Sequence, residues 1–314
     1  MKEKINNLAK HIGNTKIVIA KNLMKKYNLK SNLYLKIENT NYSGSIKDRL
    51  AFYIIKDGIE KGLIDCETII IEATSGNTGI SIAAISKYLG IKCIIVMPNF
   101  ASIERIEILK SYDAEVILTP KEKGMTGSIN KVLELKKIYD NTFSLDQFNN
   151  YLGVLAHYET TGKEIYEHLE NVDIFVCGIG TGTTFTGVSK YLKEQNKDIY
   201  CIGVEPLESN VLNNGIHHPH LIEGIGAGFI PKVLDKNFLD EVIDVSEIDA
   251  YKYTKVLYDE EKLFCGISSG AAIYAGIKIC QKYQNKNILV ILPDDGNRYI
   301  SKGVFNDGVI RNWK

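Results

Sequence analysis

The sequence of 314 residues has no excess of charge of either sign, because 38 basic residues balance 38 acidic ones. A chain without a net field does not attract nucleic acid or an anionic membrane surface, so we expect neither as a partner. Any anionic ligand must instead be bound by a local group of side chains and backbone N–H groups. The hydrophobic content of 45% supplies material for a substantial core.

The sequence also lacks a long apolar run. No stretch approaches the roughly 18 residues that a membrane-spanning helix needs. The first residues, MKEKINNLAKHIGNT, contain neither the apolar core nor the small-residue cleavage site of a secretory leader, so we expect a cytoplasmic protein. The cysteines show no C-x-x-C spacing and lie mostly in apolar runs, which favours buried thiols: Cys66, Cys93, Cys177, Cys201, Cys265 and Cys280.

Short β-rich runs alternate with segments of helical periodicity along the chain. LYLKIE, TIIIEA, DIFVC and NILVILP are typical of strands, whereas SIERIEILKSY and TTGKEIYEHLE carry apolar residues at helical spacing. This alternation predicts an α/β fold in which mostly parallel sheets are flanked by helices. No repeat or linker separates domains, and the turn-rich stretch DQFNNYLG is the best candidate for a crossing between two lobes.

Four stretches rich in glycine and hydroxyl side chains adjoin the predicted strands and helices. The first, NYSGSIKDRLAFY, places Lys47 after a Ser-Gly-Ser loop, where a solvated helix-start lysine is the simplest interpretation. The second, EATSGNTGISIAA, offers hydroxyls and backbone N–H groups at a helix N-terminus. Such a terminus can bind a carboxylate or a phosphate, although an ordinary N-cap looks similar.

The third stretch, GIGTGTTFTG, resembles a dinucleotide-binding fingerprint but lacks the third glycine of G-x-G-x-x-G. Its threonines suit one compact phosphate better than a pyrophosphate. The fourth, GISSGAA, sets two serines before another helix. Together the stretches provide an imine-forming lysine, a single-phosphate cup and a carboxylate cup. Pyridoxal 5'-phosphate (PLP) presents an aldehyde and a monophosphate, and its amino-acid substrates add a carboxylate, so the sequence predicts PLP as the cofactor.

The sequence resembles the cysteine synthase (O-acetylserine sulfhydrylase) and cystathionine β-synthase family of fold-type II PLP enzymes. The motifs HIGNT, SGSIKDR, TSGNTG, DQF, AHYETTG, GIGTGTTFTGVS, EGIGAGFIP, GISSGAA and PDDGNRY follow the family's order and cover nearly the whole chain. The resemblance implies a two-lobed α/β fold, each lobe a mostly parallel twisted sheet flanked by helices. Residues 36–147 would form the smaller N-terminal lobe, and residues 1–35 with 148–314 the larger C-terminal lobe.

The resemblance also implies roles for individual residues. Lys47 would hold the cofactor covalently and act as the catalytic base, Asn77 would bind the phenolic oxygen, and Ser268 would face the pyridine nitrogen. The phosphate cup would consist of Gly180, Thr181, Gly182, Thr183 and Thr184. The substrate carboxylate would be bound by Thr74, Ser75, Thr78 and Gln147, with Gly226 in the GIGAGF stretch at the pocket mouth.

A serine at the pyridine nitrogen cannot supply a full proton as a carboxylic acid would, which favours rapid loss of a β-leaving group over a long-lived carbanion. We therefore predict β-elimination and β-replacement on a cysteine- or serine-type amino acid through an aminoacrylate. The first choice is cysteine synthase, which converts O-acetylserine and sulfide to L-cysteine and acetate. One alternative consumes cysteine, releases hydrogen sulfide and forms serine, lanthionine or cystathionine. A more distant alternative is a non-catalytic regulatory binding protein.

The partners that the resemblance implies are an amino-acid substrate, a sulfide or thiol nucleophile, a second copy of the chain in a homodimer, and the C-terminal tail of a serine acetyltransferase. The sequence departs from the family at four positions: Lys16, Tyr42, Tyr151 and Thr183. We expect the two tyrosines near the cleft. The loop GIHHPH carries three histidines without cysteines or carboxylates at ligand spacing, so a polar loop is favoured and no metal site is predicted.

Overall fold

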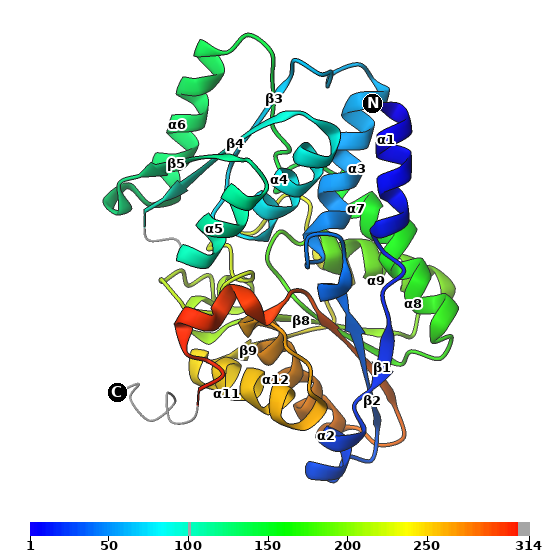
Figure 1. Ribbon diagram of the computed structural model, residues 1–314. Helices are drawn as coiled ribbons and strands as arrows, with labels where there is room; N and C mark the ends of the chain where they lie inside the picture. Colours follow the sequence, from blue (N-terminus) through cyan, green and yellow to red (C-terminus); the bar gives the residue numbers. More distant parts are fainter. Residues whose placement is uncertain (100–101, 307–314) are drawn as a thin grey trace.

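The computed structural model describes residues 1–99 and 102–306 and shows an α/β protein of two lobes (Figure 1). The lower lobe in this view is built on a six-stranded sheet, and we call it the larger lobe. The upper lobe is built on a four-stranded sheet, and we call it the smaller lobe. The predicted fold class is therefore confirmed. Within the described ranges, no helix is both long enough and apolar enough to cross a membrane.

Helices cover the sheets of both lobes. Those of the smaller lobe are α1 (Lys2–Leu8), α3 (Lys47–Glu60), α4 (Asn77–Leu89), α5 (Ile103–Ser111) and α6 (Gly124–Ile138). Those associated with the larger lobe are α2 (Lys21–Lys26), α7 (Leu152–Ala156), α8 (Lys163–His168), α9 (Thr183–Gln195), α10 (Val211–Asn214), α11 (Glu247–Glu261) and α12 (Ile267–Lys282). The π-helical turn η4 (His157–Gly162) joins α7 to α8. The 3-10 helices are η1 (Ala9–His11), η2 (Glu38–Thr40), η3 (Lys121–Lys123), η5 (Leu207–Ser209), η6 (Lys236–Phe238) and η7 (Gly296–Lys302).

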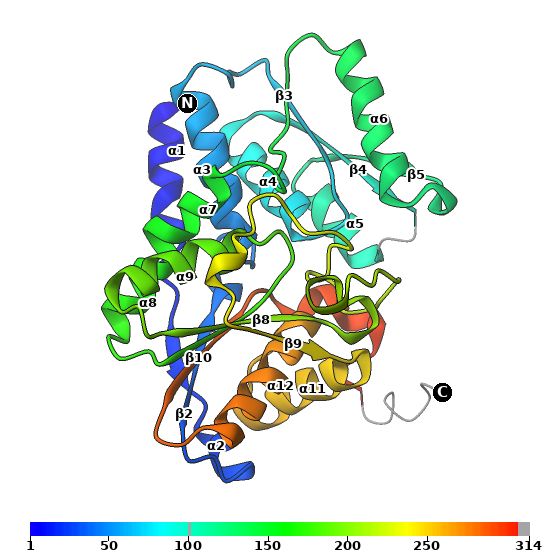
Figure 2. The same ribbon diagram turned by 180° about the vertical axis from the view of Figure 1, so that it is seen from behind.

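The larger sheet runs β1 (Ile17–Ile19), β2 (Asn32–Ile37), β10 (Asn287–Leu292), β7 (Ile174–Gly178), β8 (Tyr200–Pro206) and β9 (Glu241–Val245). All neighbouring strands are parallel except β1, which is antiparallel to β2. Figure 2 shows α8 and α9 on one side of this sheet and α11 and α12 on the other. Leu289 and Val290 of β10 pack into opposite layers. Because both faces are buried, these strands read as continuous apolar runs.

The smaller sheet is parallel throughout and runs β5 (Glu115–Thr119), β4 (Lys92–Pro98), β3 (Ile69–Ala73) and β6 (Thr142–Phe143). In β3, Ile70 packs into the core shared with α3 and α4, whereas Ile71 packs under α6. Parallel strands present their carboxyl ends at one edge, and ligands of α/β proteins bind beside such edges. The loops after β3 and β6 therefore lie where a ligand is expected.

A buried network of charges anchors the start of α3 to the larger lobe. The Arg49 guanidinium donates to Glu38 from Nε at 2.7 Å and to Glu164 from Nη1 at 2.6 Å. Lys36 Nζ donates to Glu164 Oε2 at 2.7 Å. These hydrogen bonds hold the pKa of Glu164 at about 2, although burial alone would raise it. Two cations and two anions balance, so each charge that is removed from water has a partner.

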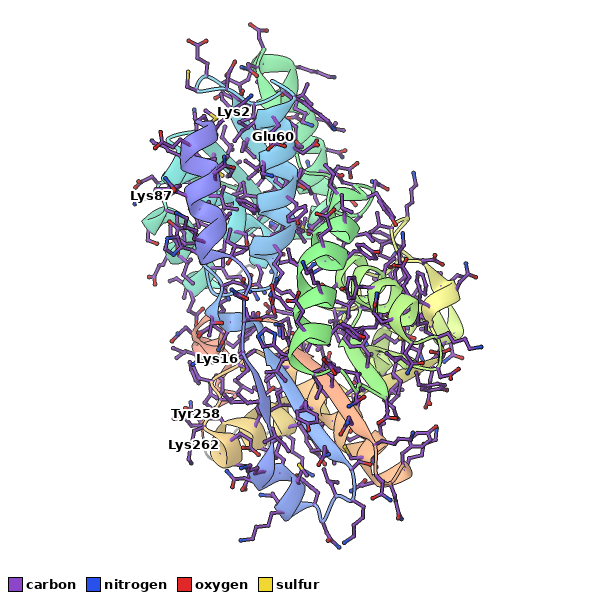
Figure 3. The ribbon with its side chains drawn as sticks, turned by 90° about the vertical axis from the view of Figure 1, so that its right-hand side faces the viewer. Lys2, Lys16, Glu60, Lys87, Tyr258 and Lys262 are labelled. Atoms are coloured by element: carbon purple, nitrogen blue, oxygen red, sulfur yellow. The ribbon has the colours of Figure 1, made fainter. Side chains whose placement is uncertain are left out.

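The predicted division of the chain into residues 36–147 and residues 1–35 with 148–314 stays a proposal, and two features of the structure bear on it. β2 runs through the boundary between residues 35 and 36 and pairs with β10 as far as Ile37. Ile5 and Leu8 of α1 pack in the core of the smaller lobe. Figure 3 shows Lys2 of α1 and Glu60 of α3 at the same end of this lobe. Residues 307–314 of the predicted larger lobe lie outside the described residues.

The cysteines are placed as expected, with one exception. Five of the six are buried and free, and Cys66 is exposed. Burial raises the pKa of the Cys177 and Cys93 thiols to about 12. These side chains therefore act as small apolar groups rather than as nucleophiles.

Candidate active site

A cavity of about 800 Å³ lies between the lobes, beside the carboxyl ends of β3, β6, β7 and β10. Eleven of the thirteen predicted site residues line it: Lys47, Thr74, Ser75, Asn77, Thr78, Gln147, Gly180, Thr181, Gly182, Thr184 and Ser268. Thr183 and Gly226 are not among the lining residues. The structure thus brings together residues from five separate stretches of the chain.

Lys47 is the first residue of α3 and points into this cavity. Its Nζ lies 3.3 Å from Thr181 Oγ1 and donates to it across the two lobes. Loss of solvation lowers the pKa of Lys47 to about 8, partly offset by the thiol of Cys177 and the carboxylate of Asp294. A lysine with this pKa is partly uncharged near neutral pH and can attack a carbonyl group. The position of Lys47 in the cavity and its contact with Thr181 favour a lysine that faces a ligand over a solvated helix-start residue.

The predicted phosphate cup lies at the N-terminus of α9. Gly182 precedes this helix with a φ of 82°, a left-handed conformation that favours glycine. Thr181 Oγ1 lies 2.9 Å from Thr183 Oγ1, and Thr184 Oγ1 lies 3.1 Å from His157 Nε2. The hydroxyls of Thr181 and Thr184 and the helix N-terminus together form an environment that suits a dianion.

Thr183 and Gly226 support the cavity from outside its wall. Thr183 is fully buried and contacts Thr181 through its hydroxyl. Gly226 N donates to Ile179 O at 2.9 Å, and Gly226 O lies 2.8 Å from His220 Nε2. The predicted contacts of Thr183 and Gly226 with a ligand stay a prediction.

The predicted carboxylate cup lies at the N-terminus of α4. Thr78 Oγ1 donates to Gln147 Oε1 at 2.5 Å, and Gly76 N donates to Thr74 Oγ1 at 3.2 Å. The Thr78 bond joins the TSGNTG and DQF motifs, which are far apart in the sequence. Since the Gln147 oxygen is occupied by this bond, the side-chain NH₂ of Gln147 is left to donate elsewhere.

Ser268 lies in the first turn of α12, at the far wall of the cavity. A Cβ built on Gly224 would lie 3.5 Å from Ser268 Oγ, so the two residues face each other closely. The GIGAGF stretch contributes Gly224, Ile225, Ala227 and Phe229 to the lining. Phe229 packs edge-on against Phe148, with 5.0 Å between the ring centroids. These two rings narrow one side of the cavity.

Tyr42 and Tyr151 are not among the residues that line the cavity. Tyr42 is at the surface and packs against Tyr88, with 6.2 Å between the ring centroids. Tyr151 is 54% exposed. Lys16, a further departure from the family, is also at the surface in Figure 3.

Two polar residues of the site were not identified from the sequence. Asp294 lies two residues after the end of β10, is fully buried, and accepts a hydrogen bond from Asn77 Nδ2 at 2.7 Å. Glu72 on β3 lines the cavity and accepts from Leu145 N at 2.8 Å. The position of Asp294, immediately after the predicted strand NILVILP, is the signal that could have pointed to it.

The groups in this cavity fit PLP. The cavity has an amine of lowered pKa in Lys47, a helix N-terminus with the hydroxyls of Thr181 and Thr184, and a single hydroxyl at Ser268. Asn77 Oδ1 is buried without a hydrogen-bond partner among the described residues, which indicates a polar ligand beside it. A Cβ on Gly180 would lie 2.3 Å from Gly224 O, so the backbone forms a close cradle that only glycine permits.

The fold and this cavity define a PLP-dependent enzyme of fold type II. A family model described as "Pyridoxal-phosphate dependent enzyme" matches residues 8–294, and the chain belongs to this family.

Named relatives narrow the class. Cysteine synthase B of Campylobacter jejuni is 43% identical over 304 residues, covering 96% of this chain and 98% of the relative. The crystal structure of cysteine synthase from Entamoeba histolytica is similar with a TM-score of 0.91 at 38% identity, covering 95% of this chain and 90% of the other. The structure of a hydrogen sulfide-producing enzyme from Fusobacterium nucleatum gives a TM-score of 0.89 at 39% identity, covering 93% and 97%.

Proposed function

We propose that this enzyme is a cysteine synthase, which replaces the acetate group of O-acetylserine by sulfide and forms L-cysteine. The observation that carries the proposal is the hydrogen bond between Thr78 and Gln147 in the same cavity as Lys47 and Ser268. This arrangement suits an α-amino acid whose carboxylate is bound on one side and whose Cα faces a lysine amine. The relatives named cysteine synthase support it.

The carboxylate of the substrate binds to the N-terminus of α4 and to the NH₂ group of Gln147. Hydrogen bonds to a charged group contribute roughly 1.5–3 kcal/mol each. The hydroxyl of Thr78 orients Gln147 by donating to its oxygen, while Thr74 and Ser75 line the same turn. These contacts place the reacting carbon in a defined position relative to Lys47.

PLP, when bound, withdraws electrons from the amino acid, which acidifies the Cα proton and lets the group on Cβ leave. Lys47 Nζ takes this Cα proton and holds it, which its lowered pKa permits near neutral pH. Thr181 and Thr184 with Gly180 and Gly182 hold the phosphate at the start of α9. Ser268 forms a hydrogen bond to the ring nitrogen without giving it a permanent proton, and this favours elimination over a long-lived carbanion.

A second candidate is the release of hydrogen sulfide from cysteine, because the Fusobacterium nucleatum structure of similar fold is named for that activity. Both reactions use the same carboxylate site and the same base. They differ in the group that leaves Cβ and in the nucleophile that follows.

We further propose a homodimer in the cytoplasm. The buried, unpaired thiols such as Cys177 and Cys201 support a reducing compartment. The C-terminal tail of a serine acetyltransferase is a proposed partner, since a peptide carboxylate could occupy the site that binds the substrate carboxylate. Sedimentation of the purified chain tests the homodimer. Binding of a peptide of that tail to the purified chain tests the proposed partner.

The function is tested by supplying the PLP-loaded enzyme with O-acetylserine and sulfide, and in parallel with cysteine alone. Cysteine formation that is faster per active site than sulfide release supports cysteine synthase. Sulfide release that is faster, with serine or lanthionine as product, supports the second candidate. A loaded enzyme that performs neither reaction would overturn both.

A further inference from the structure

Asp294 is a buried carboxylate at the junction of the two lobes. It follows β10 of the larger sheet, and its backbone forms a bridge with Ser45, two residues before Lys47. Its Oδ2 accepts two hydrogen bonds, one from Asn77 Nδ2 at 2.7 Å and one from the Tyr299 hydroxyl at 2.6 Å. Asn77 belongs to the smaller lobe, 217 positions away in the sequence, so this contact joins the lobes beside the cavity.

The contact decides which way the Asn77 amide faces. An ionised carboxylate only accepts hydrogen bonds, so the NH₂ group of Asn77 must point toward Asp294. Asn77 Oδ1 has no hydrogen-bond partner among the described residues. Without Asp294, the two ends of the amide would therefore differ little in their surroundings, and the side chain could turn over. An acceptor in the cavity would then meet the amide oxygen as often as the NH₂ group.

Tyr299 keeps Asp294 in place. Its ring is fully buried, and burial together with the Asp294 carboxylate raises the pKa of Tyr299 well above its usual value, so its hydroxyl stays a donor. The Arg105 guanidinium of α5 lies over the Tyr299 ring, 5.3 Å from its centroid. The two donors share Asp294 Oδ2, whereas Asp294 Oδ1 has no hydrogen-bond partner among the described residues.

We propose that Asp294 is a positioning residue, which holds the NH₂ group of Asn77 so that its second hydrogen donates to the phenolic oxygen of the bound cofactor. Tyr299 acts one step further out by orienting Asp294. The proposal rests on the proposed placement of Asn77 beside that oxygen. The proposal adds Asp294, a residue of the larger lobe, to the cofactor site. The contact between Asn77 and the phenolic oxygen then depends on the packing of the smaller lobe against the end of β10.

The test compares Asp294→Asn and Tyr299→Phe with the parent, each also in an Asn77→Ala background. The visible absorption band of bound PLP depends on hydrogen bonding at its phenolic oxygen, and PLP affinity is measured by titrating the cofactor-free enzyme. We expect Asp294→Asn to shift the band and to weaken PLP binding by roughly tenfold. In the Asn77→Ala background the same change should have little further effect, because the residue that Asp294 positions is gone.

Asp295→Asn is the matched control. Asp295 is the adjacent residue, and its side chain accepts from Asn297 N at 2.7 Å at the start of η7. We expect this variant to keep the band and the affinity of the parent. If Asp294→Asn changes the band and the affinity equally with and without Asn77, Asp294 has only a structural role and the proposal is overturned.

Tyr299→Phe keeps the proposal falsifiable if Asp294→Asn does not fold. It retains the carboxylate and removes one donor, so we expect a smaller shift that again disappears in the Asn77→Ala background. A shift of undiminished size in that background would overturn the proposal. Because spectrum and affinity are measured without substrate, an enzyme that forms no cysteine but shows the coupling would refute the proposed reaction and leave the role of Asp294 standing.

Discussion

Lys47 Nζ donates a hydrogen bond to Thr181 Oγ1 at 3.3 Å. The two residues come from different lobes, since Lys47 begins α3 and Thr181 lies in the loop between β7 and α9. In the proposed function, Lys47 attaches to the aldehyde of the cofactor and Thr181 binds its phosphate. Because the two groups are in contact, one cofactor molecule can reach both Lys47 and Thr181.

Lys47 should be the residue that holds PLP covalently, because it combines a place in the cavity with a pKa of about 8. Borohydride reduction of the loaded enzyme followed by peptide mapping should put the label on Lys47. Lys47→Ala should lose the label and at least roughly a thousandfold in turnover. Lys56→Ala, on an outer part of the same helix, should retain both. A label on another lysine would refute the assignment.

Gln147→Ala should bind PLP like the parent but lose roughly 10- to 100-fold in turnover with every amino-acid substrate, because a charge-assisted hydrogen bond to the carboxylate is removed. Single-turnover rates and the visible spectrum measure the two effects separately. Asn150→Ala is the control, since Asn150 lies in the same segment, is not among the residues that line the cavity, and donates from its amide to Leu145 O at 3.0 Å. Unchanged rates in Gln147→Ala would exclude the proposed carboxylate site.

Ser268→Asp should slow the loss of the β-leaving group by roughly tenfold or more, because a carboxylic acid would protonate the ring nitrogen and stabilise the carbanion. A new absorption band at longer wavelength should appear when substrate is added. Ser269→Ala provides the control, since Ser269 is the buried neighbour and is not among the residues that line the cavity. Normal turnover and an unaltered spectrum in Ser268→Asp would show that Ser268 does not contact the ring nitrogen and only forms part of the first turn of α12.

Glu72 should make the stability of the cofactor-free protein depend on pH. Burial raises the pKa of Glu72 from 4.5 to about 7, so the folded state binds a proton that the unfolded chain releases between these values. The free energy of unfolding should therefore fall as pH rises from about 4.5 to 7, by up to roughly 3 kcal/mol. Urea unfolding across this range measures the slope.

Glu72→Gln should flatten that slope, because glutamine does not titrate. Glu115→Gln is the control, since Glu115 is an exposed carboxylate in the same sheet, paired with Lys92 at 3.3 Å. It should keep the slope of the parent. An identical slope in Glu72→Gln would show that another group causes the pH dependence.

Arg49→Met should destabilise the protein by about 3–5 kcal/mol, because Glu38 and Glu164 would keep buried charges without their main partner. Thermal or urea unfolding measures this loss. Lys26→Met removes a partly exposed partner of Glu260 and should cost less than about 1 kcal/mol. Equal effects of the two variants would contradict the importance of the buried network.

Much of the site could be predicted because its residues are grouped in the sequence. Thr74 to Thr78 follow the strand β3 directly, and Gly180 to Thr184 follow β7 after one residue. A run of hydroxyls and glycines between a strand and a helix has few uses other than a cap or an anion site. The resemblance to a family then added Gln147.

Adjacency in the sequence did not decide which residues line the cavity. Tyr42 and Tyr151 lie beside site motifs, yet both face the surface. Thr183 and Gly226 lie inside site motifs, yet neither lines the cavity. Neighbouring residues in a turn point in different directions, and the direction depends on the elements that pack against the turn.

The sequence by itself determined the α/β class, the lysine, the two cups and the cofactor, because strand and helix periodicity and the chemistry of contiguous side chains are local properties. The tertiary structure decided that Lys47 meets Thr181, that Gln147 meets Thr78, and that Asn77 donates to Asp294. These properties depend on how two sheets face each other across the cavity. Burial and contacts between residues as far apart as 217 positions exist only once both lobes have packed.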